Sequence, residues 1–364
     1  MKNCYFVLPI LLVLLLAGCA PTAPAAAPTA TTAAPAAASA DLSAIKAYLL
    51  AKTTALKAST GTVKVATDRY YALAQAANFD YATLWAKQPA EVSKVLQEAK
   101  TAWMTASPLY EQMEGIVAGT PALSQFDVDL DAGASGAEGG DSVVSFDIKL
   151  PDGKVLAKPG NLFGVTESTL WGTAPEYTIA NIQPDLDGNG KVDFGEVLPD
   201  ANTLKGSIDA LDSKVGELAT AAAPWQPTET EAFGALIANV PTVGDFFDSW
   251  KNSRFVVTDP AKASRDFAAI SRLSDISDNI TSWQTIYGGL SPLVVKVDQA
   301  SDQQIQQRLS DLKTYVEDIY TKEQKGKRYT PEEADLLSAE AQNRATAIVG
   351  QLTQVAAKLK VIVQ

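Results

Sequence analysis

The sequence predicts an all-α fold made of two antiparallel helical bundles, and three observations support this prediction. Apolar residues recur at the spacing of helix faces through most of the chain. The segment Ala-Pro-Trp-Gln-Pro at 223–227 interrupts this periodicity. Two capping sequences, Thr228 with Glu231 and Thr330 with Glu333, then open helices in the second half of the chain.

The first half of the chain is expected to begin with helices, and a segment without helical periodicity is expected to follow them. Helical periodicity starts at Ile45, and further helices are expected at 63–77 and at 89–117, the last with a kink near Pro108. Residues 126–159 are rich in Gly, Asp and Ser, and they contain two short apolar segments separated by the turn sequence Pro-Asp-Gly-Lys. This order predicts a β-hairpin inserted into a helical protein.

Helical periodicity resumes at 163–172 and at 202–222, on either side of an acidic loop. In the second half, aliphatic residues at heptad-like spacing indicate a buried helix face, which comprises Ile305, Leu309, Leu312, Val316 and Ile319. A final helix is expected at 331–359, because proline occupies its first position. We therefore expect an N-terminal bundle at 41–225 and a C-terminal bundle at 226–364.

The first forty residues carry the signals of an exported lipoprotein. Residues 1–18 have a positive start and an apolar run, and the sequence Leu-Ala-Gly-Cys ends at Cys19. This order is typical of a signal peptide followed by an acylated cysteine. Residues 19–40 are uncharged and rich in Ala, Pro and Thr, so we expect a tether. The protein is expected to be extracytoplasmic and lipid-anchored at the outer membrane or cell surface; the alternative is an ordinary secreted protein.

The composition excludes several classes of function. The chain contains no histidine, and its two cysteines are Cys4, inside the predicted signal peptide, and Cys19. Catalysis by Ser-His-Asp or Cys-His groups, histidine zinc sites and a disulfide in the mature domain are therefore excluded. The formal net charge of −12 argues against nucleic acid as a partner.

The segment DLDGNGKVDFGE at 185–196 has the ligand spacing of an EF-hand-type calcium loop. Calcium prefers oxygen ligands, and the loop positions that supply them are Asp185, Asp187, Asn189, Lys191 through its carbonyl group, Asp193 and Glu196. Gly190 supplies the sharp turn, and Val192 is expected to pack on the core. Pro184 and Pro199 leave little room for flanking helices, so we expect a structural Ca²⁺ site; the alternative is an acidic turn without metal.

Four segments of the chain are similar to those of one known family. They are PLYEQMEGIVAGTPALSQFDVDLDAG, LFGVTESTLWG, LSDISDNITSWQTIY and the last helix, YTPEEADLLSAEAQNRATAIVGQL. In sequence and in order, these segments resemble those of the imelysin family, which includes iron-uptake lipoproteins of the EfeO/EfeM type. The resemblance implies four helices in each bundle, so the predicted fold is all-α: two antiparallel four-helix bundles with an inserted β-hairpin and a calcium loop.

The resemblance also implies a metal site built from carboxylates of the first bundle. The residues that match the family's acidic ligands are Glu111, Glu114, Glu167, and Asp127 or Asp131. The family's signature histidine falls on Gly164, which removes one ligand and puts peptidase activity in doubt. The remaining carboxylates suit a hard cation such as Fe³⁺. The alternative is that they are solvated charges or a vestigial site.

Two smaller patterns leave alternatives open. The alternation of Asp127, Asp129 and Asp131 suits either a second calcium site or a solvated loop. Asp275 and Asn279 lie one helical turn apart, so they are expected to cap or to form hydrogen bonds across the bundle.

Three functions follow as candidates. The leading one is a non-catalytic, lipid-anchored, calcium-binding protein with a role in iron or other metal uptake, whose partners are metal ions and an iron permease system. The second is a cell-surface binding or scaffold protein for a polysaccharide or a protein. The third is a metallopeptidase, which the absence of histidine disfavours.

Overall fold

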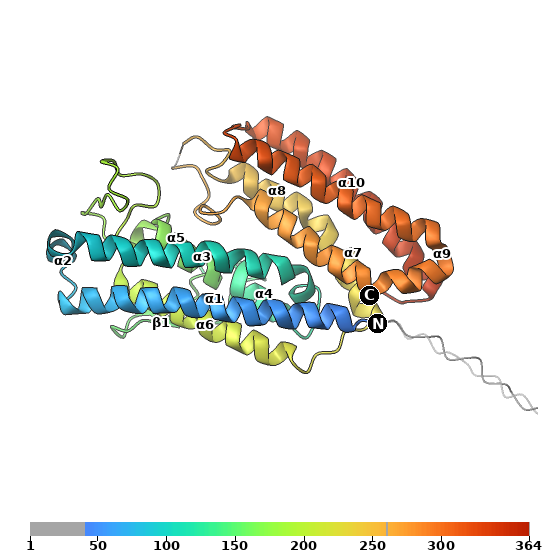
Figure 1. Ribbon diagram of the computed structural model, residues 1–364, viewed down its shortest axis with the longest axis horizontal. Helices are drawn as coiled ribbons and strands as arrows, with labels where there is room; N and C mark the ends of the chain where they lie inside the picture. Colours follow the sequence, from blue (N-terminus) through green and yellow to red (C-terminus); the bar gives the residue numbers. More distant parts are fainter. Residues whose placement is uncertain (1–40, 260, 364) are drawn as a thin grey trace, which may run out of the picture. The chain divides into compact units, whose positions relative to one another are not determined.

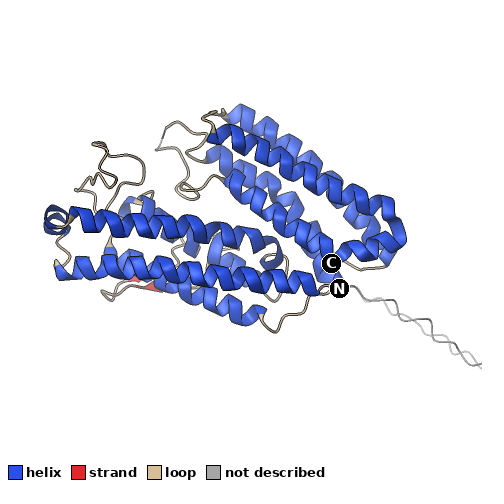
Figure 2. Ribbon diagram, in the orientation of Figure 1, coloured by secondary structure: helices blue, strands red, loops and turns tan. Residues whose placement is uncertain are grey.

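The computed structural model describes residues 41–259 and 261–363, and these residues form an all-α fold with one small β-hairpin, as predicted (Figures 1 and 2). The elements in chain order are α1 (Ser43–Ala76), α2 (Tyr81–Lys87), α3 (Pro89–Val117), α4 (Ser124–Asp127), the π-helix η1 (Val128–Ala132), β1 (Ile148–Lys149), β2 (Val155–Leu156), α5 (Leu162–Trp171), the 3₁₀-helix η2 (Pro175–Tyr177), α6 (Ala201–Ala222), α7 (Glu229–Asn239), the 3₁₀-helix η3 (Val240–Thr242), α8 (Val243–Asn252), α9 (Arg272–Gln324) and α10 (Pro331–Leu359).

Helices α1, α3 and α6 form the core of the first bundle, and α5 packs against α6. The expected hairpin is present: β1 and β2 are antiparallel, with Ile148 opposite Leu156, and β1 contacts α6. The predicted helices at 89–117, 163–172 and 202–222 are confirmed by α3, α5 and α6.

Two expectations for the first half are corrected. Residues 43–76 form one continuous helix, although two helices were expected, because Leu56, Thr60 and Val63 are all buried along one face and tertiary packing outweighs the low helix propensity of Gly61. The acidic segment at 124–132 is helical and not a solvated loop. Aspartate has low helix propensity, so the local sequence gave no signal for this short helix.

The second bundle is formed by α7 to α10 (Figure 1). Both predicted capping boxes are present, at Thr228 and Thr330, and the heptad-like stripe of α9 is buried. Helix α9 departs from helical geometry at Asp298, whose carboxylate accepts a hydrogen bond of 2.9 Å from the Ser301 amide and so caps the second arm. Four helical segments were predicted for the second bundle. They are the α7–α8 segment, the two arms of α9 on either side of Asp298, and α10.

Helix α3 also packs directly against α9, which joins the two halves of the described region. Gly115 permits this close approach, because a Cβ atom there would lie 2.3 Å from Ser282 Oγ and 2.7 Å from Trp283 Cδ1. The described residues belong to one compact unit, so the division into domains at residue 225 stays a prediction. This packing of α3 on α9 positions the acidic residues of α3 opposite the first turns of α9.

The predicted signal peptide, Cys19 and the tether at 19–40 lie outside the described residues. Among the described helices, none has the length and hydropathy needed to cross a membrane.

Candidate metal centre

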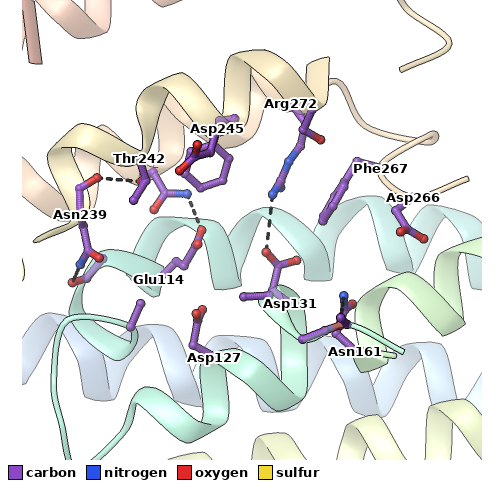
Figure 3. A pocket seen from close by; sticks show the side chains of 18 of the residues that line it. Glu114, Asp127, Asp131, Asn161, Asn239, Thr242, Asp245, Asp266, Phe267 and Arg272 are labelled. Carbon is purple, nitrogen blue, oxygen red and sulfur yellow. Dashed lines mark hydrogen bonds and ion pairs between the residues drawn. The ribbon is translucent and has the colours of Figure 1, made fainter. Parts of the chain in front are cut away.

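A cavity of about 450 Å³ lies where α3, η1 and the first turns of α9 meet, and acidic side chains dominate its polar lining. Figure 3 shows Glu114, Asp127 and Asp131 facing Arg272 across this space. Asp127 and Asp131 are four residues apart in the α4–η1 segment, so both project toward the cavity. The structure therefore brings together residues as far apart in the sequence as Glu114 and Arg272, which are separated by 158 positions.

The carboxylates of Glu111, Glu114 and Asp131, which we call the buried acidic group, form the centre of this site. Each offers an oxygen, and these three oxygens all lie within 4.8 Å of one another. All three residues are buried, and Asp131 Oδ1 has no hydrogen-bond partner. Leaving a buried charged oxygen without a partner is costly, so this atom is suited to a further ligand.

Arg272, at the first turn of α9, supplies the cation that the buried acidic group faces. Its guanidinium group lies 3.0 Å from Asp275 Oδ2, 3.6 Å from Glu111 Oε1 and 3.7 Å from Asp131 Oδ2. The same group lies over the ring of Phe267, 3.4 Å from its centroid. This stacking and pairing hold Arg272 in place, although one positive charge balances only part of the acidic charge.

The amide of Asn279, two turns further along α9, joins the two glutamates. Its Nδ2 atom donates hydrogen bonds to Glu111 Oε2 at 3.1 Å and to Glu114 Oε2. The expectation that Asn279 bonds across the bundle is thus confirmed. Both glutamates belong to α3, so these bonds also fix α9 against α3.

Burial raises the pKa values of the carboxylates around the cavity. It raises the pKa of Glu114 to about 8, with additional repulsion from Asp127 and Asp131. Burial likewise raises the pKa of Asp127 to about 7, although Tyr110 Oη donates a hydrogen bond of 2.7 Å to it. Burial and the neighbouring acids place the pKa of Glu111 well above its usual range. At neutral pH the site therefore holds protons that a bound cation would displace.

Glu167 lies outside the buried acidic group. Its Oε1 atom accepts hydrogen bonds from the amides of Ala268 and Ala269, at 2.7 and 3.1 Å, and its Oε2 atom accepts one from Trp103 Nε1 at 3.2 Å. These donors satisfy the buried carboxylate without a metal. The contacts with Ala268 and Ala269 attach the loop between α8 and α9 to α5.

Gly164, onto which the sequence resemblance places the family's histidine, has polar atoms beside it. A Cβ atom there would lie 3.1 Å from Asn161 Oδ1 and 3.3 Å from Asp266 Oδ1. Asn161 caps α5, because its Oδ1 atom accepts a hydrogen bond of 2.7 Å from the Gly164 amide. Asp266 belongs to the loop between α8 and α9. The carboxylate of Asp266, from the second half of the chain, thus borders the space beside Gly164.

The loop at 185–196 forms a second group of acidic side chains, which we call the calcium loop. Oxygens of Asp185, Asp187 and Glu196 lie within 4.8 Å of one another. Gly190 has the positive φ expected of the turn, and its amide donates to Asp185 Oδ2 at 2.8 Å. The Glu196 carboxylate accepts hydrogen bonds from the backbone amides of Leu186, Asp187 and Asp193.

The other predicted loop ligands are close by. Asn189 Nδ2 donates to the carboxylates of Asp187 and Asp193, at 2.9 and 3.0 Å, and Asn189 Oδ1 accepts the Lys191 amide. The expectation that Val192 packs on the core is wrong, because its side chain is 47% exposed.

Several residues of the site were not singled out from the sequence. Among them are Arg272, Asp266 and Phe267, which all line the cavity. Arg272 lies three and seven residues before Asp275 and Asn279, a spacing that places all three on one helix face. That spacing is a signal that could have identified Arg272, whereas Asp266 and Phe267 belong to a loop without periodicity.

The imelysin family model, which also carries the name peptidase M75, matches residues 44–359 of the chain. A search of curated proteins gives no match.

Proposed function

The chain belongs to the imelysin family, and we propose that it is a non-catalytic metal-binding protein whose buried acidic group takes a hard cation, Fe³⁺ foremost, as its cargo. Carboxylate oxygens suit such cations. The observation that supports this proposal most directly is Asp131 Oδ1, a buried oxygen without a hydrogen-bond partner that belongs to a group of three clustered carboxylates.

The charges around the cavity support the same proposal. Arg272 is the only cationic side chain that lines the cavity, within the part of the chain described, and it faces Asp131, Asp275 and Glu111. Burial raises the pKa values of Glu114 and Asp127, and repulsion from the neighbouring carboxylates adds to this effect. A multivalent cation would stabilise the ionised forms and release these protons.

The proposal that the protein is not a peptidase rests on the ligand chemistry. Catalytic zinc sites use histidine ligands in most cases, and this chain has no histidine. The residues that remain near the family's histidine position are Gly164, Asn161 and Asp266, none of which supplies a nitrogen base. Binding is therefore the function that these side chains suit.

The calcium loop is proposed to hold a structural Ca²⁺ ion that stabilises the segment between α5 and α6. The convergence of Asp185, Asp187 and Glu196 on one point supports this role. We further propose that Cys19, in the sequence Leu-Ala-Gly-Cys, carries a lipid that anchors the protein outside the cytoplasm, where it delivers its cargo to an iron permease system.

Elemental analysis tests these assignments. The intact protein is dialysed against calcium and ferric citrate beside the variants E114Q and E196Q. Glutamine is a close replacement at Glu114, because it has nearly the same shape and because the burial that raises the pKa of Glu114 favours a neutral side chain. We expect wild type to retain one iron and one calcium, E114Q to lose iron only, and E196Q to lose calcium only. Absence of iron from wild type, or iron retained by E114Q, would contradict the proposed cargo site.

A further inference from the structure

A second cavity, of about 600 Å³, lies between the calcium loop and the loop that joins α8 to α9. Its lining includes the arginines Arg254, Arg265 and Arg328 and the aromatic residues Trp171 and Phe194. It shares no lining residue with the acidic cavity, so an inference from it stands independently of the proposed metal site. We call it the arginine cavity.

Two guanidinium groups of this cavity form no ion pair in the described part of the chain, although the carboxylates of Glu167 and Glu323 act on Arg254 at longer range and that of Glu323 also on Arg328. Arg328 Nη1 donates to the carbonyl oxygens of Arg254 and Phe255, at 3.3 and 3.0 Å, and Arg254 Nε donates to the carbonyl oxygen of Ala268. Neither arginine forms an ion pair with any described residue, whereas Arg265 pairs with Glu176 at 2.9 Å. Two adjacent, unpaired guanidinium groups favour an anion.

The rest of the lining is largely apolar and firmly held. The guanidinium group of Arg254 stacks on Phe194, 3.8 Å from the ring centroid. Gly195 packs so closely on Trp171 that a Cβ atom would lie 2.5 Å from Trp171 Cδ1, and Lys100 donates to the Gly195 carbonyl oxygen. Phe194 is 46% exposed, so its ring borders the opening of the cavity. Such a wall suits the flat apolar body of an organic ligand.

We propose that the arginine cavity binds a small organic carboxylate with an aromatic or similarly flat apolar body. The carboxylate lies between Arg254 and Arg328, where two N–H groups of one guanidinium can bind both of its oxygens. The body lies along Trp171 and Phe194. The cavity volume falls within the range of small-molecule sites, and this binding function is separate from the metal cargo.

Isothermal titration calorimetry of the intact protein with 2-naphthoate tests this proposal, with 2-naphthamide and inorganic phosphate as comparison ligands. We expect 2-naphthoate to bind with one-to-one stoichiometry and at least about tenfold more tightly than either comparison ligand, because only 2-naphthoate offers both the charge and the flat body. Equal binding of 2-naphthamide would overturn the role of the arginines. Equal binding of phosphate would overturn the role of the aromatic wall.

Three variants locate the binding. R328Q changes an exposed side chain and should weaken 2-naphthoate binding about tenfold. R308Q removes an exposed arginine from α9, which does not line the cavity, and should have no effect. A261W adds a bulky side chain to the exposed rim of the cavity and should abolish binding without changing charge. Unchanged affinity in both R328Q and A261W would overturn the proposal.

Discussion

The buried acidic group and the calcium loop each bring three carboxylate oxygens within 4.8 Å of one another, but they hold them in different ways. In the calcium loop, Asp185 and Glu196 accept hydrogen bonds from backbone amides of the same twelve-residue segment. In the buried acidic group, side chains of one distant helix, α9, interact with the carboxylates: Arg272 pairs with them, and Asn279 donates hydrogen bonds to both glutamates.

This difference has a physical consequence for the two sites. The geometry of the calcium loop depends on residues close together in the sequence, and the loop is partly exposed to solvent. Water therefore screens the repulsion between its carboxylates. The buried acidic group is shielded from water, so its carboxylates depend on Arg272 and on bound protons. We therefore expect changes in the buried group to alter the stability of the whole fold, and changes in the calcium loop to act locally.

The largest effect is expected from R272M, which removes the cation of the buried acidic group. Leaving buried carboxylates without their partner should lower the free energy of unfolding of the metal-free protein by about 3–5 kcal/mol. Urea unfolding followed by circular dichroism measures this change. The control is R308M on the exposed side of α9, which should change stability by less than about 0.5 kcal/mol. A loss below about 1 kcal/mol in R272M would show that Arg272 is not the main counter-charge.

A second prediction concerns pH. The native protein holds protons on Glu114 and Asp127, whose pKa values lie at about 8 and about 7, while the unfolded chain releases them near pH 4. The native state thus binds more protons, so the free energy of unfolding of the metal-free protein should fall as pH rises from about 5 to 8. Urea unfolding across this range measures the slope, and E114Q should flatten it. A stability that rises with pH would contradict the account.

Glu167 offers a comparison within the same half of the molecule. E167Q weakens hydrogen bonds to Ala268 and Ala269 and should cost about 1–3 kcal/mol, because a buried acceptor loses part of its interactions. It should leave the iron content unchanged, since Glu167 lies outside the buried acidic group. Unfolding and elemental analysis of one preparation measure both quantities. Loss of iron with unchanged stability would assign Glu167 to the metal site instead.

The smallest effect is expected in the calcium loop. With 10 mM calcium and a dissociation constant near 1 mM, calcium should stabilise the protein by only about 1.4 kcal/mol, and E196Q should abolish this gain. K191A is the matched control, because the predicted ligand at that position is the backbone carbonyl group. Thermal unfolding with and without calcium measures the difference. A gain that persists in E196Q would place calcium elsewhere.

The sequence predicts well those features that depend on neighbouring residues. The capping boxes at Thr228 and Thr330 and the turn of the hairpin all lie within a few residues of their partners. The pairing of Glu111 with Arg272 depends on how α3 packs against α9, and no local pattern specifies that packing. For the same reason the helical form of 124–132 could not be foreseen, because tertiary contacts bury Asp129 and Asp131 there.

The most direct test of the buried acidic group compares D131N with D129N. The two aspartates belong to the same turn of π-helix and both are buried, but Asp129 pairs with Lys214 at 3.3 Å and lies outside the group. The measurement is the iron retained by each variant of the intact protein after dialysis against ferric citrate. The account predicts that D131N loses its iron and D129N keeps it. Iron retained equally by both variants, or lost equally from both, would contradict a cation site at the buried acidic group.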